Sequence, residues 1–252
     1  MAGCGAAGKS VSLEMGGKSP AVVLPDADLE AAVAGIAFGA FLNQGECCCA
    51  ATRVLVSEDL HDEFVARFVA TSRAIRIGDP LDEATRMGPL VSADHLQAVV
   101  DYVHAGLDEG AKLVCGGPEK PAGLTTGYYL APTVFDQVSP QMRIYREEIF
   151  GPVLTVSTYR DVDEALTMAN DTPYGLAASV WTRDLRQAHT FARKIRAGTV
   201  WLNVHNFVFS QAPYGGYKLS GVGRELGRLG VEAFLETKNV MVWLGDEPFT
   251  WY

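Results

Sequence analysis

Short apolar runs alternate with segments of helical periodicity along most of the chain. Residues 92–109 carry apolar side chains at helical spacing and end before a glycine, as an amphipathic helix does. We expect further helices at residues 26–42, 61–74, 162–169, 185–196 and 224–235. Strands are expected at residues 112–115, 153–159, 178–182, 199–203 and 239–244. This order predicts an α/β fold with a mostly parallel sheet flanked by helices.

The most apolar stretch, residues 31–42, predicts a buried helix. It is shorter than the roughly 20 apolar residues that cross a bilayer. The first residues show neither the basic and apolar regions of a secretion signal nor a glycine at position two for myristoylation. We therefore expect a cytoplasmic protein with no membrane partner.

The composition is that of a globular protein. The chain has 252 residues, of which 48% are hydrophobic and 20% charged, enough for a sizeable core. Its formal charge of −9 argues against a nucleic-acid partner, because no basic stripe is present to neutralise phosphates. A small neutral substrate is compatible with this charge.

The cysteines and histidines indicate neither a disulfide framework nor a metal site. The five cysteines are an odd number, three of them are adjacent, and none forms a Cys-x-x-Cys pair. The five histidines are scattered without the spacing of metal ligands. Reduced thiols and no metal are the expectation.

One motif near the start imitates a nucleotide-binding loop. Residues 3–10 satisfy the letter pattern of the phosphate-binding P-loop, and Gly3, Gly5 and Gly8 also match the dinucleotide fingerprint. Both motifs require a preceding strand and a following helix, whereas residues 11–13 predict a strand and no helix is expected at Lys9. We interpret this segment as a flexible entry into a strand, and a nucleotide hydrolase is the most distant alternative.

A thiol and a carboxylate are the candidate reactive groups. Residues 41–49, Phe-Leu-Asn-Gln-Gly-Glu-Cys-Cys-Cys, place Cys48 just past a glycine that ends a helix. Glu14 comes shortly before the Gly16-Gly17 bend. A nucleophile and a base converging on one site would support covalent catalysis. The alternatives are a buried, unreactive cysteine and a solvated carboxylate.

Five ordered motifs carry a resemblance to a known family. The segments around Glu14 and Cys48 are joined by residues 147–153, Glu-Glu-Ile-Phe-Gly-Pro-Val, by Trp-Leu-Asn at 201–203 and by residues 213–221. From about Lys9 to its end, the chain resembles the C-terminal, catalytic half of the NAD(P)-dependent aldehyde dehydrogenases. The resemblance implies oxidation of an aldehyde to a carboxylic acid through a thiohemiacetal and a thioester on the cysteine.

The resemblance also assigns roles to individual residues. Cys48 takes the place of the nucleophile and Glu14 that of the base which activates water. Glu148 and Phe150 correspond to the residues that hold the nicotinamide-side ribose and pack near the nicotinamide. The substrate pocket would be lined by residues that are also candidates for core packing, namely Tyr214, Phe207, Val208 and Phe209. Cys47 and Cys49 are expected to pack rather than react, and Cys4 and Cys115 to be structural.

Members of this family are about twice as long, and the resemblance implies that most of the coenzyme-binding domain is missing here. Residues 1–16 would be its remnant carrying the glutamate loop, residues 17–222 the catalytic domain, and residues 223–252 a C-terminal helix and bridging strand. NAD or NADP is the implied cofactor, although binding by this half alone is doubtful, and Glu14 would lie at an unpaired edge. We expect a homo-oligomer formed through the last strand, residues 239–244.

Two alternatives to dehydrogenase turnover by this chain stay open. In the first, Cys48 and Glu14 would hydrolyse an ester through an acyl-enzyme, as a thiol esterase that needs no nucleotide. A truncated remnant with a structural or oligomerisation role would need neither group. The sequence does not distinguish NAD from NADP, nor does it identify the aldehyde.

Overall fold

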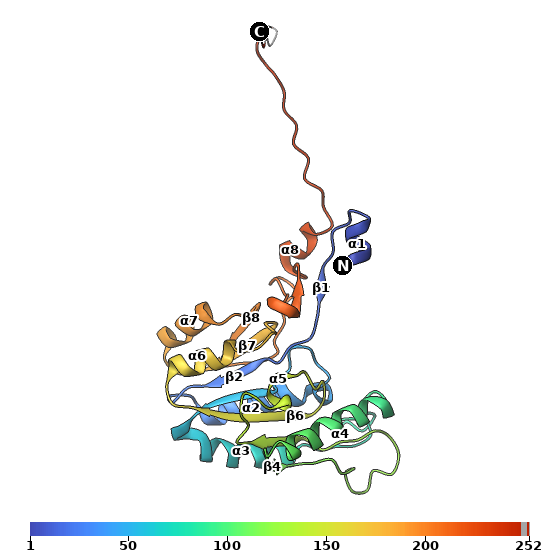
Figure 1. Ribbon diagram of the computed structural model, residues 1–252, viewed down its shortest axis with the longest axis vertical. Helices are drawn as coiled ribbons and strands as arrows, with labels where there is room; N and C mark the ends of the chain where they lie inside the picture. Colours follow the sequence, from blue (N-terminus) through green and yellow to red (C-terminus); the bar gives the residue numbers. More distant parts are fainter. Residues whose placement is uncertain (248–250, 252) are drawn as a thin grey trace.

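A mostly parallel sheet forms the body of the computed structural model, which describes residues 1–247 and 251 (Figure 1). Within these residues, the seven-stranded sheet has the order β4-β5-β6-β3-β2-β7-β8. Its strands are β2 (Pro20–Val23), β3 (Arg53–Ser57), β4 (Lys112–Cys115), β5 (Thr133–Asp136), β6 (Val153–Tyr159), β7 (Ala177–Trp181) and β8 (Thr199–Leu202). Only the edge strand β4 runs antiparallel to its neighbour, with an irregularity between Leu113 and Cys115. The α/β class predicted from the sequence is confirmed.

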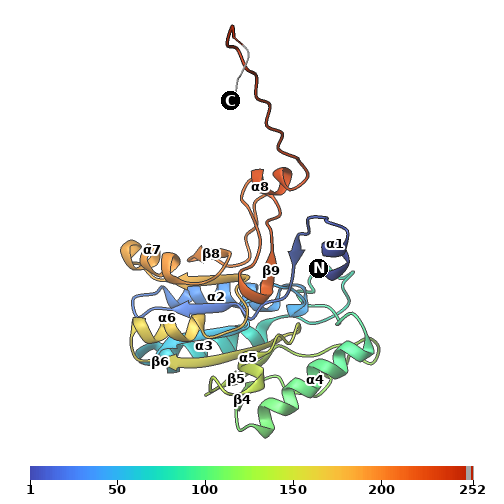
Figure 2. The same cartoon turned by 45° about the horizontal axis from the view of Figure 1, so that its top comes forward.

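Helices cover both faces of this sheet and bury a core on each side (Figures 1 and 2). One core packs α2 (Leu29–Phe41) and α3 (His61–Ala74) against the strands. The other packs α4 (Ala93–Asp108), α6 (Val162–Asn170) and α7 (Leu185–Lys194) against the opposite face. The short helix α5 (Arg143–Arg146) lies beside α4. Asp28, Ser92, Asp161 and Asp184 cap four of these helices through side-chain oxygens, which satisfies N–H groups of the first turn.

A second, smaller unit projects from one end of the body. Here β1 (Leu13–Glu14) pairs antiparallel with β9 (Gly221–Val222), near the helices α1 (Ala2–Ala6) and α8 (Gly227–Glu232) (Figure 2). We call residues 1–15 and 221–235 the arm. Gly221 has φ of +146°, and a Cβ there would collide with the carbonyl oxygen of Leu13, so the pairing requires glycine. The expected unpaired edge at Glu14 is thus covered on one side by β9.

Several sequence predictions were wrong, for physical reasons. Strands β2, β3 and β5 were missed because they are buried on both faces and lack the apolar–polar alternation that signals a strand. The segment at residues 3–10, predicted to be a flexible entry into a strand, contains most of the helix α1. The strand predicted at residues 11–13 begins later, at Leu13, and comprises Leu13–Glu14. Helix α8 is shorter than the predicted 224–235.

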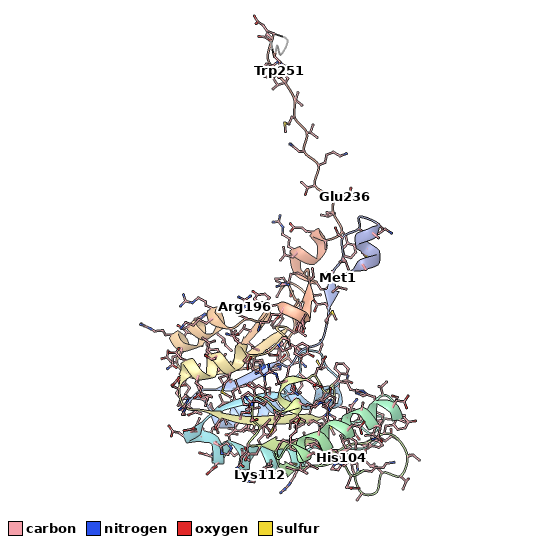
Figure 3. All side chains as sticks on the ribbon, in the orientation of Figure 1. Met1, His104, Lys112, Arg196, Glu236 and Trp251 are labelled. Atoms are coloured by element: carbon pink, nitrogen blue, oxygen red, sulfur yellow. The ribbon has the colours of Figure 1, made fainter. Side chains whose placement is uncertain are left out.

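The predicted strand at residues 239–244 does not form within this chain. These residues lie in an extended segment without ladder partners, and Figure 3 shows it leading away from the body between the labelled Glu236 and Trp251. Val240, Met241 and Leu244 are largely exposed on it. An edge supplied by another chain is not part of this structure, so the expected pairing between subunits stays a prediction.

Among the helices of the described residues, none has the length and apolar character needed to cross a membrane.

Candidate active site

The cysteine loop follows a sharp bend after α2. Helix α2 passes into a short helical turn, η1 (Leu42–Gly45), in which Asn43, Gln44 and Gly45 have φ of 51°, 59° and 72°. Gly45 packs against the backbone of Gly151, where a Cβ would collide with the carbonyl group. The Asn43 side chain donates to the Glu46 carbonyl at 2.9 Å, and the Gln44 side chain accepts from the Gly88 N–H at 3.1 Å. These contacts fix the backbone that leads to Cys48.

The three adjacent cysteines form a compact cluster of free thiols. Their sulfur atoms all lie within 4.8 Å of one another, and those of Cys47 and Cys49 are 3.6 Å apart. Hydrogen bonds with the neighbouring thiols lower the pKa of Cys47 and raise that of Cys49. One negative charge in the cluster is stabilised by the S–H groups beside it, whereas a second is repelled.

The spacing of the three thiols bears on the expectation that the protein holds no metal, which stays a prediction. Within the described part of the chain, these three cysteines are the grouping whose donor atoms are close enough for one ion. A spacing rule based on Cys-x-x-Cys overlooks it because the residues are adjacent. In the structure all three sulfurs have a polar neighbour. The Asn206 Oδ1 atom lies 3.0 Å from the Cys49 sulfur and 3.9 Å from that of Cys47, and the Tyr214 hydroxyl lies 3.9 Å from that of Cys48.

Glu14 and Cys48 are brought to one site by the Gly16-Gly17 bend. The backbone at Gly17 lies so close to the cysteine loop that an added Cβ would be 2.9 Å from the Cys48 carbonyl oxygen. Partial burial, followed by the nearby Cys48 and Glu225 charges, raises the pKa of Glu14. A carboxylate with a raised pKa is a stronger base than a free one. The sequence prediction that these two groups converge therefore agrees with the geometry.

Glu148 lies on the opposite side of the same bend. Its Oε1 atom accepts a hydrogen bond from the Gly17 N–H at 3.2 Å, and its carboxylate occupies the space that a side chain at Gly16 would need. Burial raises the pKa of Glu148, and the charge of Cys48 adds to this shift. The Cys48 charge contributes to the raised pKa values of both Glu14 and Glu148, so the sulfur lies within electrostatic range of the two carboxylates.

Phe150 is held in a strained conformation close to Glu148 in sequence. Its φ is 57°, its ring is 39% exposed, and its carbonyl oxygen lies 2.7 Å from the His95 Nε2 atom. An exposed aromatic ring in the left-handed region is uncommon, and such strain is frequent at functional sites. Together, the Glu148 carboxylate and this ring suit a ribose with two hydroxyl groups and a flat heterocycle.

The predicted pocket residues fall into two groups. The Tyr214 hydroxyl lies 3.9 Å from the Cys48 sulfur, and burial is the main cause that raises the Tyr214 pKa. Phe207, Val208 and Phe209 are each more than half exposed, so the core-packing alternative does not apply to them. Among these, Phe207 contacts the exposed Phe38 of α2, with ring centroids 6.2 Å apart.

Three residues near the site were missed at the sequence level. His205 is fully buried beneath the cysteine loop, Asn206 contacts the thiols, and Lys18 is fully buried directly after the glycine bend. Burial lowers the pKa of Lys18 to about 7. His205 appeared only as one of five scattered histidines. Its position after the Trp-Leu-Asn motif was the one available signal.

The structure does not give the P-loop match the setting that motif needs. Gly3 and Gly5 lie inside the five-residue helix α1 rather than in a loop, and Lys9 follows this helix instead of starting one. No strand precedes the glycines within the described residues. Phosphate binding by a P-loop requires the strand–loop–helix order, so this match is coincidental.

Known proteins with the same arrangement identify the family. Residues 1–240 match the aldehyde dehydrogenase family. The chain is 45% identical to the mitochondrial aldehyde dehydrogenase of Homo sapiens, over 93% of this chain and 45% of that protein. It is 46% identical to the betaine aldehyde dehydrogenase of Brucella anthropi, over 96% of this chain and 50% of that protein.

Solved structures give the same result. The NAD-dependent aldehyde dehydrogenase from Sinorhizobium meliloti superposes with a TM-score of 0.93 at 47% identity, covering 97% of this chain and 48% of that one. A mutant of Pseudomonas syringae aldehyde dehydrogenase C, solved with NAD+ and octanal, superposes with a TM-score of 0.89 at 47% identity, covering 91% of this chain and 47% of that one. The chain spans about half the length of the curated relatives it matches. It belongs to the aldehyde dehydrogenase family.

Proposed function

We propose that this chain is the catalytic half of an NAD(P)-dependent aldehyde dehydrogenase, with Cys48 as nucleophile and Glu14 as base. The observation that carries the proposal is the contact of the Gly16-Gly17 bend with both the Cys48 loop and Glu148. It gathers a thiol and two carboxylates from three distant segments of sequence. Family membership supports the reaction class, and the geometry supports the choice of residues.

Cys48 begins the reaction as a thiolate that attacks the aldehyde carbonyl carbon. A carbon–sulfur bond forms, and the carbonyl electrons move onto oxygen, giving a thiohemiacetal anion. Backbone N–H groups of the cysteine loop are the candidates to stabilise this oxyanion, because η1 and its contacts hold that backbone rigid. Tyr214, 3.9 Å from the sulfur, limits how the substrate approaches.

Glu148 and Phe150 would hold the cofactor against this sulfur. The Glu148 carboxylate, which already accepts from the Gly17 N–H, would accept hydrogen bonds from ribose hydroxyls, and the partly exposed Phe150 would present its ring to the nicotinamide. NAD(P)+, when bound, accepts the hydride that leaves the thiohemiacetal carbon, so that a thioester stays on Cys48. The NAD+ complexes among the similar solved structures support this cofactor class.

Glu14 completes the cycle by removing a proton from water. The resulting hydroxide attacks the thioester carbon, the carbon–sulfur bond breaks, and a carboxylic acid and the Cys48 thiolate are released. The raised pKa of Glu14 suits this role, because its carboxylate holds the proton more firmly than a free one. Glu14→Gln should slow thioester hydrolysis by about 10²–10³-fold while leaving acylation of Cys48 intact.

The substrate pocket is proposed to be apolar. An exposed apolar run precedes Tyr214 in the sequence and consists of Phe207, Val208 and Phe209. The bound octanal in one similar structure is consistent with an aliphatic aldehyde. A small aldehyde is therefore the substrate class that we propose.

The domain division follows from the same proposal. Residues 17–222 build the sheet and the cysteine loop, whereas residues 1–16 would belong to a coenzyme-binding domain. Residues 223–252 would form the contact between subunits, since Val240, Met241 and Leu244 are exposed on the extended segment. We propose a cytoplasmic homo-oligomer.

A second candidate is a thiol esterase without a nucleotide. It is favoured because Cys48, Glu14 and their supporting glycines all lie in this chain, while the chain spans about half the length of its relatives. An activated ester would acylate Cys48 directly, and Glu14 would assist hydrolysis of the same thioester. A remnant that only assembles with other subunits would show neither reaction.

The deciding experiment measures NAD(P)H formation from an aldehyde by the purified chain. Turnover that disappears in Cys48→Ala and is retained in Cys115→Ala, a buried cysteine outside the cluster, supports the oxidation. Absence of NAD(P)H formation rejects oxidation by this chain alone. Hydrolysis of an aryl ester without nucleotide then separates the esterase from the assembly role.

A further inference from the structure

A hydrogen-bonded chain connects strand β7 of the sheet to the cysteine loop. The indole Nε1 of Trp181 donates to the Ser179 Oγ atom at 3.2 Å, and this Oγ lies 2.9 Å from Nδ1 of His205. The Nε2 atom of His205 lies 2.8 Å from the Cys49 carbonyl oxygen. Trp181 and Ser179 are buried residues of β7. A buried strand of the sheet is therefore linked by hydrogen bonds to the backbone next to Cys48.

The protonation state of His205 follows from its surroundings. Burial lowers the His205 pKa to about 4, so the ring is neutral at neutral pH. The Cys49 carbonyl can only accept, so Nε2 carries the proton and donates to it. Nδ1 then accepts from the Ser179 hydroxyl. One tautomer satisfies both partners, which gives the ring one orientation.

Packing also restricts the ring to this position. The ring centroids of Trp201 and His205 are 4.6 Å apart. On the α2 side, a Cβ at Gly39 would lie 2.6 Å from the His205 Cδ2 atom, so glycine is needed for the ring to fit. The histidine is thus clamped between a strand and a helix.

Asn206, the next residue, contacts the thiols themselves. Its Oδ1 atom accepts from the Cys49 sulfur at 3.0 Å and lies 3.9 Å from that of Cys47, and its Nδ2 atom lies 3.8 Å from the Cys47 sulfur. Asn206 has φ of 64°, a conformation that asparagine tolerates better than most residues. The amide therefore engages both outer thiols, while Cys48 lies near the Tyr214 hydroxyl and within electrostatic range of the two carboxylates.

We propose that His205 and Asn206 are positioning residues that decide which of the three adjacent thiols reacts. His205 holds the loop through the Cys49 carbonyl, and Asn206 occupies the Cys47 and Cys49 thiols, so that Cys48 alone is presented to the substrate. This inference rests on Cys48 being the nucleophile of the proposed function. It goes beyond that function by assigning the selection among the thiols to two residues other than the proposed nucleophile and base.

Alkylation of the whole chain by iodoacetamide, with each cysteine followed by mass spectrometry, tests the selection without a nucleotide or an aldehyde. Although the pKa of Cys47 is lowered, Cys48 should react at least about tenfold faster than Cys47 or Cys49, because Asn206 occupies the two outer thiols. In Asn206→Ala this preference should fall to about threefold or less, because the outer thiols lose a hydrogen-bond partner. Asn206→Asp, which keeps an acceptor oxygen, should retain more of the preference.

His205 variants test the backbone clamp. His205→Leu should slow Cys48 alkylation about fivefold, whereas His205→Gln, whose amide N–H can still reach the Cys49 carbonyl, should recover to within about twofold of the parent. His104→Leu, at the exposed histidine labelled on α4 in Figure 3, is the matched control and should have no effect. Circular dichroism identifies variants that have lost the fold. If His205→Leu or Asn206→Ala does not fold, the alkylation rates of His205→Gln or Asn206→Asp decide whether the residue has the positioning role.

The outcomes separate this inference from the proposed function. If Cys48 is not the fastest thiol in the parent chain, both are overturned. If Cys48 is fastest but the His205 and Asn206 variants keep the same rates and preference, the positioning role is overturned and the nucleophile assignment survives. A loss of preference in Asn206→Ala together with recovery in His205→Gln supports the proposal.

Discussion

Cys48 and Glu14 lie in two regions that are built very differently. Cys48 follows a loop anchored to a seven-stranded sheet. Gly17 and His205 pack against the backbone of Cys48 and Cys49, and Gly45 holds the start of the loop against Gly151. Glu14 lies on the arm, in a ribbon that pairs over only two residues with β9 (Figure 2). A two-residue ribbon provides little independent stability. The proposed nucleophile is therefore positioned by the fold of this chain, and the proposed base far less so.

This difference suggests that the two halves of the proposed reaction depend on different parts of the protein. Attack by Cys48 needs only the sheet and its loops. Hydrolysis of the thioester also needs the arm, which carries Glu14 and the exposed apolar residues of α8. A further domain or subunit that covers the arm would improve the second step more than the first. A variant in one region should therefore affect that region's stability or reaction step and leave the other region's unchanged.

The largest effect is expected in the sheet, at Arg53. This fully buried guanidinium on β3 donates to the Tyr145 hydroxyl and to the carbonyls of Met168 and Ala169, at 3.0, 2.8 and 2.9 Å. Arg53→Met leaves these acceptors without a donor and should lower the free energy of unfolding by about 3–5 kcal/mol. Urea denaturation measures this free energy of unfolding. Arg160→Met, at an exposed ion pair, should leave the free energy of unfolding almost unchanged. Equal effects would contradict this account.

Lys18 predicts how the stability of the sheet region depends on pH. Its pKa is about 7 in the fold against an ordinary 10.5, so the unfolded chain binds the proton more strongly. The free energy of unfolding should therefore rise as the pH increases from 7 towards 10.5. Below pH 7 the full destabilisation from burying a charged Lys18 should be present. Lys18→Met removes this contribution and should stabilise the fold at pH 7 by about 2–4 kcal/mol. Denaturation curves at several pH values, with Lys9→Met as an exposed control, should show the difference only for Lys18.

A smaller, local effect is expected in the arm. Gly221→Ala places a methyl group against the Leu13 carbonyl and should separate β1 from β9. Hydrogen exchange at residues 13–15 should speed up, while the global free energy of unfolding changes by about 1 kcal/mol or less. Thioester hydrolysis should slow about tenfold because Glu14 loses its position, with acylation of Cys48 unchanged. Gly3→Ala, where nothing lies within 4 Å of the added carbon, is the control, and slower acylation in Gly221→Ala would break the comparison.

The sequence predicted the sheet's class and most helices because their apolar periodicity is local. Helix α3 and strands β4 and β6 occur within the bounds expected from the pattern. Strands β2, β3 and β5 were not predicted, since a strand buried on both faces has no alternation to detect. The segment at 239–244 has a strand-like sequence but no partner within the chain, and pairing is a property of the neighbour as much as of the segment.

Residues of the candidate site that lie in short sequence motifs were predictable. Residues that belong to the site through contacts with distant parts of the chain were not. Glu14, Cys48 and Glu148 were found from glycine-containing motifs, whose glycines the structure shows to be contact points between the loops. His205 and Asn206 were not found, because their importance depends on Ser179 and Cys49, which are distant in sequence. Long-range contacts of this kind leave no periodic signal. The same holds for the thiol cluster, where adjacency rather than spacing brings the sulfur atoms together.

The most direct test of the central claim, that this chain alone positions Cys48 as a nucleophile, is the acylation burst with an aryl ester in the absence of nucleotide. The burst should release one aryl group per chain, and the acyl group should be found by mass spectrometry on Cys48. It should persist at full amplitude in Gly221→Ala, whose arm is displaced. Absence of a burst in the folded chain, or an acyl group on another residue, would contradict the account.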